Sequence, residues 1–551
     1  MDPEITTADA GLSSRRTLLW ASVALFLLYA ASGSRERPWG DATPVFEVAE
    51  NLVAHGEIYS SSRWPADQLP GRGHHYHALN PIVNSLVHLP GLALRGILSP
   101  VWPLPATTLV ALSSHVGPFA AGVLTCLLFL LLCMELGVAP RVAWWSAAAL
   151  AFATPVWVWA RSPYTEICQT ACLTGLVLFT ARIARVQSWR NALWLGVWAG
   201  LLINTKVVHV ASLACAAAYA SVLLRPWARA ARKEAARLAG FVLLGFLPFL
   251  LLNLSYNYLR FGSWFATGYP SSGIITERWY VGLWGLLFSF GKSVLLYSPL
   301  HALTLLALAR MTRRPGRLAI AIACLTLPSM MISSQLVCWS GDYAWGPRYL
   351  APLLPTFLLP AVLLVDRIAK RSLRRRWQAG FLVGVLALCG VLVQGLGGAF
   401  YWDHFIRIAR EVDTQWLGLP QKVCPAPPPG EPSRPAQECA KCFEDMYALH
   451  WLPPFQPIEG QAWLLSHVVK GDTWRTAEAD GPWHRYTSQR FQIAETYARA
   501  RIDWWILEFV PDHLPLGCSI LGVMLLAGAA CVRRARKHAR GNPRRETSAP
   551  P

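Results

Sequence analysis

Long apolar segments recur along most of this chain and restrict its fold more than any other feature. Most of them are long enough to cross a bilayer as a helix, which takes about 20 residues. With 54% apolar and only 15% charged residues, the chain is too apolar for an ordinary soluble protein of 551 residues. We predict an all-α polytopic membrane protein, a transmembrane bundle of about twelve helices. The predicted spans are residues 17–33, 107–134, 142–160, 164–186, 190–206, 207–224, 238–258, 284–308, 317–336, 348–366, 378–398 and 515–532.

The basic residues test this count, because cytoplasmic loops of membrane proteins carry an excess of Lys and Arg. With a cytoplasmic N-terminus, the basic clusters near 182–190, 225–237, 310–317 and 367–376, and the tail beyond 533, all fall on one side. A miscounted span would have moved the later clusters to the other side. The net charge of +19 therefore indicates membrane topology, with both termini cytoplasmic, rather than nucleic-acid binding.

The same alternation assigns four larger pieces of chain to the outer side, where we expect function. They are residues 34–106, 259–283, 337–347 and 399–514. We accordingly divide the chain into a transmembrane core that includes the first outer loop, an outer loop or small domain, and a final helix with a basic cytoplasmic tail. These parts are residues 1–398, 399–514 and 515–551.

Three cysteines lie in the polar outer piece rather than in apolar runs. Cys424, Cys439 and Cys442 form an odd set without histidines at zinc-finger spacing. This pattern favours one disulfide and one free thiol over a zinc site. Such a bridge requires an oxidising compartment, in agreement with the predicted outer side.

The first outer loop carries a lone carboxylate, Asp41, beside a flexible glycine and just before a predicted helix that ends near Gly56. Thr43 is suited to cap this helix and Pro44 to occupy its first position. The apolar residues of the segment recur on one face, so we expect an amphipathic helix that rests on the bilayer surface. This arrangement would hold Asp41 at the boundary between membrane and water.

Other polar side chains lie at or near the outer ends of the predicted spans. Charges near bilayer depth are costly, so each is a candidate functional residue, although Lys and Arg near span ends also reach the interface by snorkelling. Glu166 follows Pro163 at a span start, where it is suited to cap the helix, to serve the site, or to do both. The full set is Glu166, Lys206, Tyr258, Arg260, Lys292, Asp342 and Arg348.

One carboxylate with several cations at a lipid interface fits a lipid-phosphate substrate. The cations would bind the phosphate, and the carboxylate would remove a proton from the acceptor. Arg348 follows a turn rich in aromatic residues and glycine, and its forked donors suit phosphate. A proton-coupled transporter would place its acids nearer the bilayer midplane, where acids are scarce in this chain.

A histidine cluster, His74, His75 and His77 around Tyr76, also lies in the first outer loop. Imidazoles bind zinc and other transition metals. Adjacent side chains in a strand or loop point in different directions, however, so we favour contacts with the surface or with a sugar over a metal site.

The ordered combination of these motifs resembles the GT-C superfamily of membrane glycosyltransferases. The resemblance covers nearly the whole membrane portion. Within the superfamily, it points to bacterial proteins similar to protein O-mannosyltransferases and to the aminoarabinose transferases of lipid A. The motifs that carry it are Gly40-Asp41, residues 162–166, residues 257–262 with Gly268-Tyr269, residues 285–299 and residues 345–349.

This resemblance implies an inverting glycosyltransferase of the bacterial inner membrane. Such an enzyme transfers a hexose or pentose from a polyprenyl-phosphate donor to a lipid, glycan or protein acceptor on the non-cytoplasmic side, without a cofactor. A divalent metal is not supported by the spacing. The implied catalytic residues are Asp41, as general base, and Glu166. The implied phosphate ligands are Arg348, Lys206, Arg260 and Lys292, and the implied substrate-lining residues are Tyr258, Tyr269, Trp345 and His77.

The sequence also departs from the family. Many relatives follow the first acid with a second, whereas Ala42 follows Asp41 here. The outer piece 399–514 aligns only at residues 451–458, and it is a candidate for acceptor selection. Two other functions fit the same topology. A transporter or lipid flippase would usually show repeated halves, which are not evident, and a scaffold would use the outer piece to bind partners.

Overall fold

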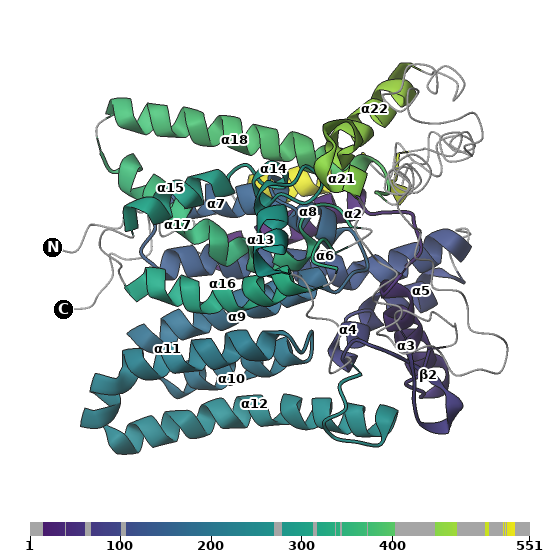
Figure 1. The fold of residues 1–551 in the computed structure, drawn as a ribbon, viewed down its shortest axis with the longest axis horizontal. Coiled ribbons are helices and arrows are strands. Elements are labelled where there is room, and N and C mark those ends of the chain that lie inside the picture. The colour runs from purple at the N-terminus through teal and green to yellow at the C-terminus, as the bar shows by residue number, and fades with distance from the viewer. Residues whose placement is uncertain are drawn as a thin grey trace, which may run out of the picture.

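The structure is a computed structural model, and it is almost entirely helical (Figure 1). It describes residues 15–38, 40–60, 68–100, 106–268, 278–311, 317–336, 338–341, 344–371, 373–402, 447–470, 502–505, 522, 524 and 526–534. Cys424, Cys439, Cys442, Tyr269 and Asp342 lie outside the described residues, as does most of the predicted outer domain.

Long helices lie side by side and form the body of the molecule (Figure 1). They are α2 (Arg15–Ala31), α6 (Ala106–Glu135), α9 (Glu166–Arg185), α10 (Trp189–Ile203), α11 (His209–Ala230), α12 (Arg232–Phe261), α16 (Arg317–Gln335), α17 (Leu354–Ala369) and α18 (Leu373–Ala399).

Shorter elements connect and flank them. The short helices of the first outer loop and of the core are α3 (Ala42–His55), α4 (Ile82–Leu86), α5 (Leu89–Leu98), α7 (Pro140–Phe152), α8 (Val156–Ala160), α13 (Trp279–Phe288), α14 (Val294–Tyr297) and α15 (His301–Met311). The outer piece adds α21 (Tyr447–Trp451) and α22 (Pro457–Lys470), and the 3₁₀ turns are η1 (Arg72–His74), η2 (Arg348–Leu353) and η4 (Pro453–Phe455). Strands β1 (Gln68–Pro70) and β2 (Tyr76–Ala78) pair antiparallel, with Leu69 opposite His77.

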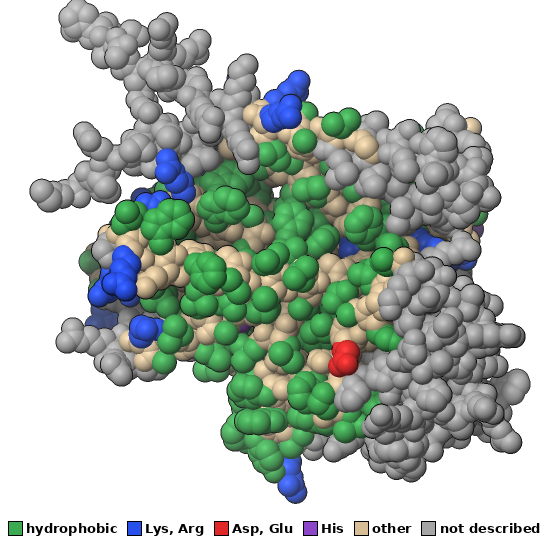
Figure 2. All heavy atoms as spheres, turned by 90° about the horizontal axis from the view of Figure 1, so that it is seen from above, with side chains coloured by type: hydrophobic (Ala, Val, Ile, Leu, Met, Phe, Trp, Pro, Cys, Tyr) green, Lys and Arg blue, Asp and Glu red, His purple; other side chains and the backbone are tan. Residues whose placement is uncertain are grey.

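Six of the described helical segments are at least 18 residues long and apolar enough to cross a membrane. Their environments differ. About 67–78% of the most apolar window is buried in α6, α9 and the segment Arg348–Ala369, but only 11% in α11, α12 and α18. The first three therefore form the packed centre, and the others turn apolar surface outward, as expected for helices in contact with lipid. Apolar side chains cover much of one face, with several Lys and Arg near one edge (Figure 2).

The predicted spans up to residue 399 correspond to a helix or to a short run of helices. The least distinct boundary, between 190–206 and 207–224, is confirmed, because Asn204 to Val208 form a turn between α10 and α11. The predicted single span 284–308 is wrong, since the chain breaks into α13, α14 and α15. Ser293 begins α14, and its hydroxyl accepts hydrogen bonds from the next backbone amides.

The helix after Asp41 is confirmed as α3, which ends at Gly56 with a left-handed φ of 71°. The predicted cap is wrong. Asp41 occupies the cap position without a capping side-chain bond, and the Thr43 hydroxyl donates instead to the carbonyl of Pro38 at 2.9 Å. Pro44 is the third residue of α3 rather than the first, as predicted, and its missing amide is still harmless there.

Candidate active site

Arg348 pairs with two carboxylates from distant parts of the chain. Its Nε donates to Oε1 of Glu166 at 2.7 Å, and its guanidinium also pairs with Oδ2 of Asp41. Asp41 immediately precedes α3, Glu166 begins α9, and Arg348 begins η2. The structure therefore brings these three predicted site residues together where three helical elements begin.

The three side chains of this ion cluster differ in their exposure to solvent. The Glu166 side chain is 1% exposed, that of Arg348 11% and that of Asp41 25%. The second carboxylate oxygen of Glu166 is buried and has no hydrogen-bond partner among the described residues. A buried acceptor without a donor is unfavourable, so a ligand hydroxyl at this position would improve the site.

Two aromatic rings contact the cations of the site. The Arg348 guanidinium lies 4.9 Å from the centre of the Tyr164 ring. Lys206, in the turn between α10 and α11, places its Nζ 4.8 Å from the centre of the Tyr349 ring and interacts electrostatically with Glu166 and Asp41. Lys206 is therefore the second predicted phosphate ligand that the structure places at the cluster.

The turn that presents Arg348 depends on two glycines. Gly341 and Gly346 have φ values of 70° and 65°, which side chains rarely adopt. A Cβ atom at Gly341 would lie 2.8 Å from the Cβ of Arg348, and one at Gly346 would lie 2.8 Å from the Tyr297 ring. The predicted tight turn is therefore confirmed, and its geometry requires glycine at both positions.

Lys292 lies between α13 and α14, is fully buried, and contacts the turn that precedes Arg348. Its Nζ donates to the carbonyl of Ala344 at 2.7 Å. Trp345 is also buried, with its indole N–H donating to the Gln394 side chain at 3.2 Å. In this structure both residues hold the turn in place, and Trp345 does not line an open surface.

Arg260 and His77 fasten the first outer loop to the end of α12. Arg260 donates to the carbonyl of Ala78 at 2.6 Å and to the Asn257 side chain at 2.7 Å, while its guanidinium lies 4.1 Å from the Tyr256 ring centre. His77 is buried nearby and lies 3.3 Å from the carbonyl of Ile58. These contacts join Arg260 to the loop backbone rather than to the Arg348 cluster.

Tyr258 lies at the exposed end of α12. Its ring stacks on Trp264 with centroids 4.7 Å apart, and the Arg72 guanidinium lies 5.4 Å from its centre. Among the described residues, no group of three or more His, Cys, Asp or Glu is arranged to hold a metal ion. In the cluster itself, both carboxylates are already paired with Arg348.

Arg161 is not among the predicted site residues, although it is 1% exposed and lies just before Glu166 in the chain. A signal was present, because Arg161 is a basic residue at the outer end of a predicted span, where the positive-inside rule does not expect one. Its buried partner, Asp503, carried no comparable signal in the sequence.

No protein-family model matches the sequence, and no curated protein matches it. Solved structures do. ArnT from Cupriavidus metallidurans bound to undecaprenyl phosphate is 14% identical over 92% of this chain and 88% of ArnT, with a TM-score of 0.48. ArnT in the apo state gives the same identity and TM-score, over 95% of this chain and 77% of ArnT. The oligosaccharyltransferase AglB from Archaeoglobus fulgidus, in complex with an inhibitory peptide and a dolichol-phosphate, is 13% identical over 78% of this chain and 63% of AglB, with a TM-score of 0.40. The chain is similar to these solved structures over most of its own length.

Proposed function

We propose that the protein is an inverting membrane glycosyltransferase that moves a sugar from a polyprenyl-phosphate donor to a lipid, glycan or protein acceptor on the non-cytoplasmic side. The single observation that carries the proposal is the contact of Arg348 with Asp41 and Glu166, with Lys206 beside them. The partial exposure of Asp41, at 25%, supports access of an acceptor to this carboxylate.

In the proposed reaction, Asp41 takes a proton from the acceptor nucleophile as the nucleophile attacks the anomeric carbon of the sugar. The bond between this carbon and the phosphate oxygen breaks on the opposite face, which inverts the anomeric configuration. The departing phosphate gains negative charge, and Arg348 and Lys206 stabilise that charge.

Glu166 has a different environment and therefore a different proposed role. It is buried and paired with Arg348, and its second oxygen faces no donor in the described structure. We assign this oxygen to a sugar hydroxyl, which would orient the donor relative to Asp41. The resemblance of the sequence to GT-C enzymes supports a location in a bacterial inner membrane, and the basic loops support cytoplasmic termini.

The test is sugar transfer by the Asp41→Asn variant in membranes or in reconstituted vesicles with labelled polyprenyl-phosphate sugars. Loss of the general base is expected to reduce kcat by about 10²-fold or more. The matched control is Glu50→Gln, which removes a carboxylate from α3, the helix that follows Asp41; Glu50 pairs with Arg95 at 2.6 Å. This control is expected to keep wild-type activity.

Activity of Asp41→Asn within about threefold of wild type would exclude the general-base role, since that role predicts about 10²-fold. Movement of a labelled lipid across vesicles by the wild-type protein, with no transfer product from any donor, would instead favour the flippase function.

A further inference from the structure

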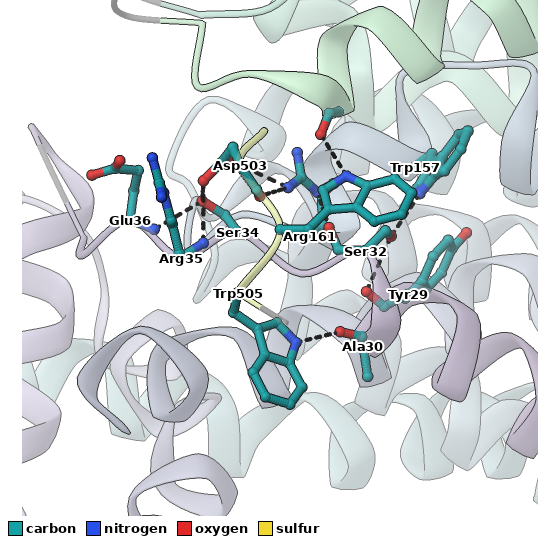
Figure 3. A network of polar contacts seen from close by, with 12 residues as sticks. Tyr29, Ala30, Ser32, Ser34, Arg35, Glu36, Trp157, Arg161, Asp503 and Trp505 are labelled. Atoms are coloured by element: carbon teal, nitrogen blue, oxygen red, sulfur yellow. Dashed lines mark hydrogen bonds and ion pairs between the residues drawn. The ribbon is translucent and has the colours of Figure 1, made fainter. Parts of the chain in front are cut away.

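Arg161 and Asp503 form a second buried ion pair, separate from the Arg348 cluster (Figure 3). Their side chains are 1% and 3% exposed, and Nη2 of Arg161 lies 3.3 Å from Oδ2 of Asp503. Arg161 also donates to the backbone carbonyls of Ser32 and Asp503. Arg161, the C-terminal cap of α8, thus joins the end of α2 to residue 503 of the outer piece 399–514.

Asp503 contacts the first outer loop from its other carboxylate oxygen. Oδ1 accepts hydrogen bonds from the Ser34 hydroxyl at 2.9 Å and from the backbone amide of Arg35 at 3.1 Å. The backbone amide of Asp503 donates to the carbonyl of Ala399, at the end of α18, at 2.6 Å. Both oxygens of this buried carboxylate are therefore engaged, as a stable buried pair requires.

Trp504 and Trp505, which follow Asp503, also bond to the ends of α2 and α18. The backbone amide of Trp505 donates to the carbonyl of Gly33 at 3.0 Å, and its indole N–H donates to the carbonyl of Ala30 at 2.7 Å. The Trp504 indole donates to the carbonyl of Gly398 at 2.9 Å. Residues 502–505 are thus bonded along the exit of α2 and the end of α18.

These contacts lie at the start of the two segments that carry the site carboxylates, residues 32–41 with Asp41 and residues 161–166 with Glu166. Residues 32–35 lead directly to Asp41, and Arg161 leads through Tyr164 to Glu166. The two segments also approach one another at their tips, because a Cβ atom at Gly40 would lie 3.8 Å from the Tyr164 hydroxyl. A shift at the start of either segment would therefore change how Asp41 and Glu166 meet Arg348.

We propose that Arg161 and Asp503 are positioning residues of the candidate active site, which lock the two acid-bearing segments at the separation that Arg348 spans. Residues 502–505, from the outer piece 399–514, then hold these two segments in place. This inference rests on the proposed function. The reacting groups remain Asp41, Glu166 and the cations, and the buried pair acts only through them.

The main test variant is Asp503→Asn, which keeps the shape of the side chain and removes its charge. We expect kcat to fall at least about tenfold with the donor KM within about twofold, because small misplacements of reacting groups reduce rates strongly. Asp503→Glu restores the carboxylate and is expected to recover part of kcat. Ser34→Ala removes one bond to Asp503 without leaving a charge unpaired, and it carries the test if Asp503→Asn fails to fold.

Hydrogen exchange measured by mass spectrometry on the full-length protein gives a readout independent of activity. In Asp503→Asn, the amides of residues 30–41 and 161–166 are expected to exchange faster, while those of α10 and α12 keep their wild-type rates. The matched control is Glu135→Gln, which removes partly exposed pairs with Arg182, at 3.5 Å, and Arg185, at 3.2 Å, at the other ends of α6 and α9. It should change neither kcat nor exchange in these two segments.

If hydrogen exchange in residues 30–41 and 161–166 is unchanged in Asp503→Asn, then Asp503 does not hold these segments in place. Faster local exchange with unchanged kcat would overturn the positioning role, and so would faster exchange spread over the whole chain with unchanged kcat of the folded fraction. If the wild-type protein transfers no sugar from any polyprenyl-phosphate donor, the proposed function fails. Hydrogen exchange then still decides whether Asp503 locks the two segments.

Discussion

Two of the buried arginines in the described structure, Arg348 and Arg161, have different kinds of partners. Arg348 bonds two carboxylates and a tyrosine ring, and one of those carboxylates is 25% exposed. Arg161 bonds one carboxylate and two backbone carbonyls, and neither member of its ion pair is more than 3% exposed. Both join segments that are far apart in the sequence, but only the Arg348 cluster is accessible to another molecule.

This difference separates an arginine suited to chemistry from one suited to structure. Two of the partners of Arg161 are backbone carbonyls, which cannot move away without unfolding local structure. The carboxylates around Arg348 are side chains, which can exchange one hydrogen-bond partner for a ligand. The first arrangement favours rigidity, and the second favours the electrostatic stabilisation of a changing charge.

The strongest test of the comparison is Arg348→Lys. An ammonium lacks the planar fork that reaches Asp41 and Glu166 together, so we expect kcat/KM for sugar transfer to fall by about 10²-fold or more. The matched variant, Arg161→Lys, should reduce kcat less. Equal losses in the two variants would remove the distinction between the arginines.

The second test concerns the free energy of unfolding. Arg161→Gln leaves the carboxylate of Asp503 buried without its charged partner, which typically destabilises a protein by about 3–5 kcal/mol. Arg95→Gln breaks a pair that is 30% and 31% exposed, and such pairs contribute at most about 1 kcal/mol. Denaturation in detergent should show this order, and equal stabilities of the two variants would contradict the buried role of Arg161.

The smallest expected effect is a pH dependence in the first outer loop, away from both arginines. Burial lowers the pKa of His77 below its usual 6.5, and the nearby charge of Arg260 lowers it further. The neutral ring is then favoured in the folded state, so its stabilisation is complete above pH 6.5 and is lost as the pH falls below that value. Arg72 and His75 lie close enough to modify the shift.

The measurement is the melting temperature between pH 7.5 and 5.5. His77→Asn should flatten the decline relative to wild type, because asparagine does not titrate in this range. An identical slope in the two proteins would mean that other groups cause the acid sensitivity.

Most of the helical architecture is predictable from the sequence, because length, hydropathy and loop charge all point to the same spans. The breaks are less predictable. The segment 284–308 is apolar enough overall to predict one span despite Lys292 and Pro299, yet Ser293 caps a new helix inside it and Lys292 bonds a distant carbonyl. Such tertiary contacts override a continuous hydrophobic pattern without leaving a periodic signal.

The candidate site was predictable to a similar extent. Asp41, Glu166, Lys206 and Arg348 were identifiable as polar residues at the outer ends of spans, and the structure brings them together. Their pairing was not predictable, because the sequence fixes neither the rotation of a helix nor its neighbours. For the same reason Arg260, placed with them by its position at a span end, bonds the loop backbone instead.

The bond between Ser34 and Asp503 has a consequence for the synthesis of the protein, because 469 residues separate the two side chains. At about 5–20 residues per second, translation reaches Asp503 roughly 25–90 s after it has passed Ser34. During this interval α2 and the core helices are already available to insert into the membrane. The contacts that hold residues 32–35, at the start of the first outer loop, therefore form only after nearly the whole chain has been made.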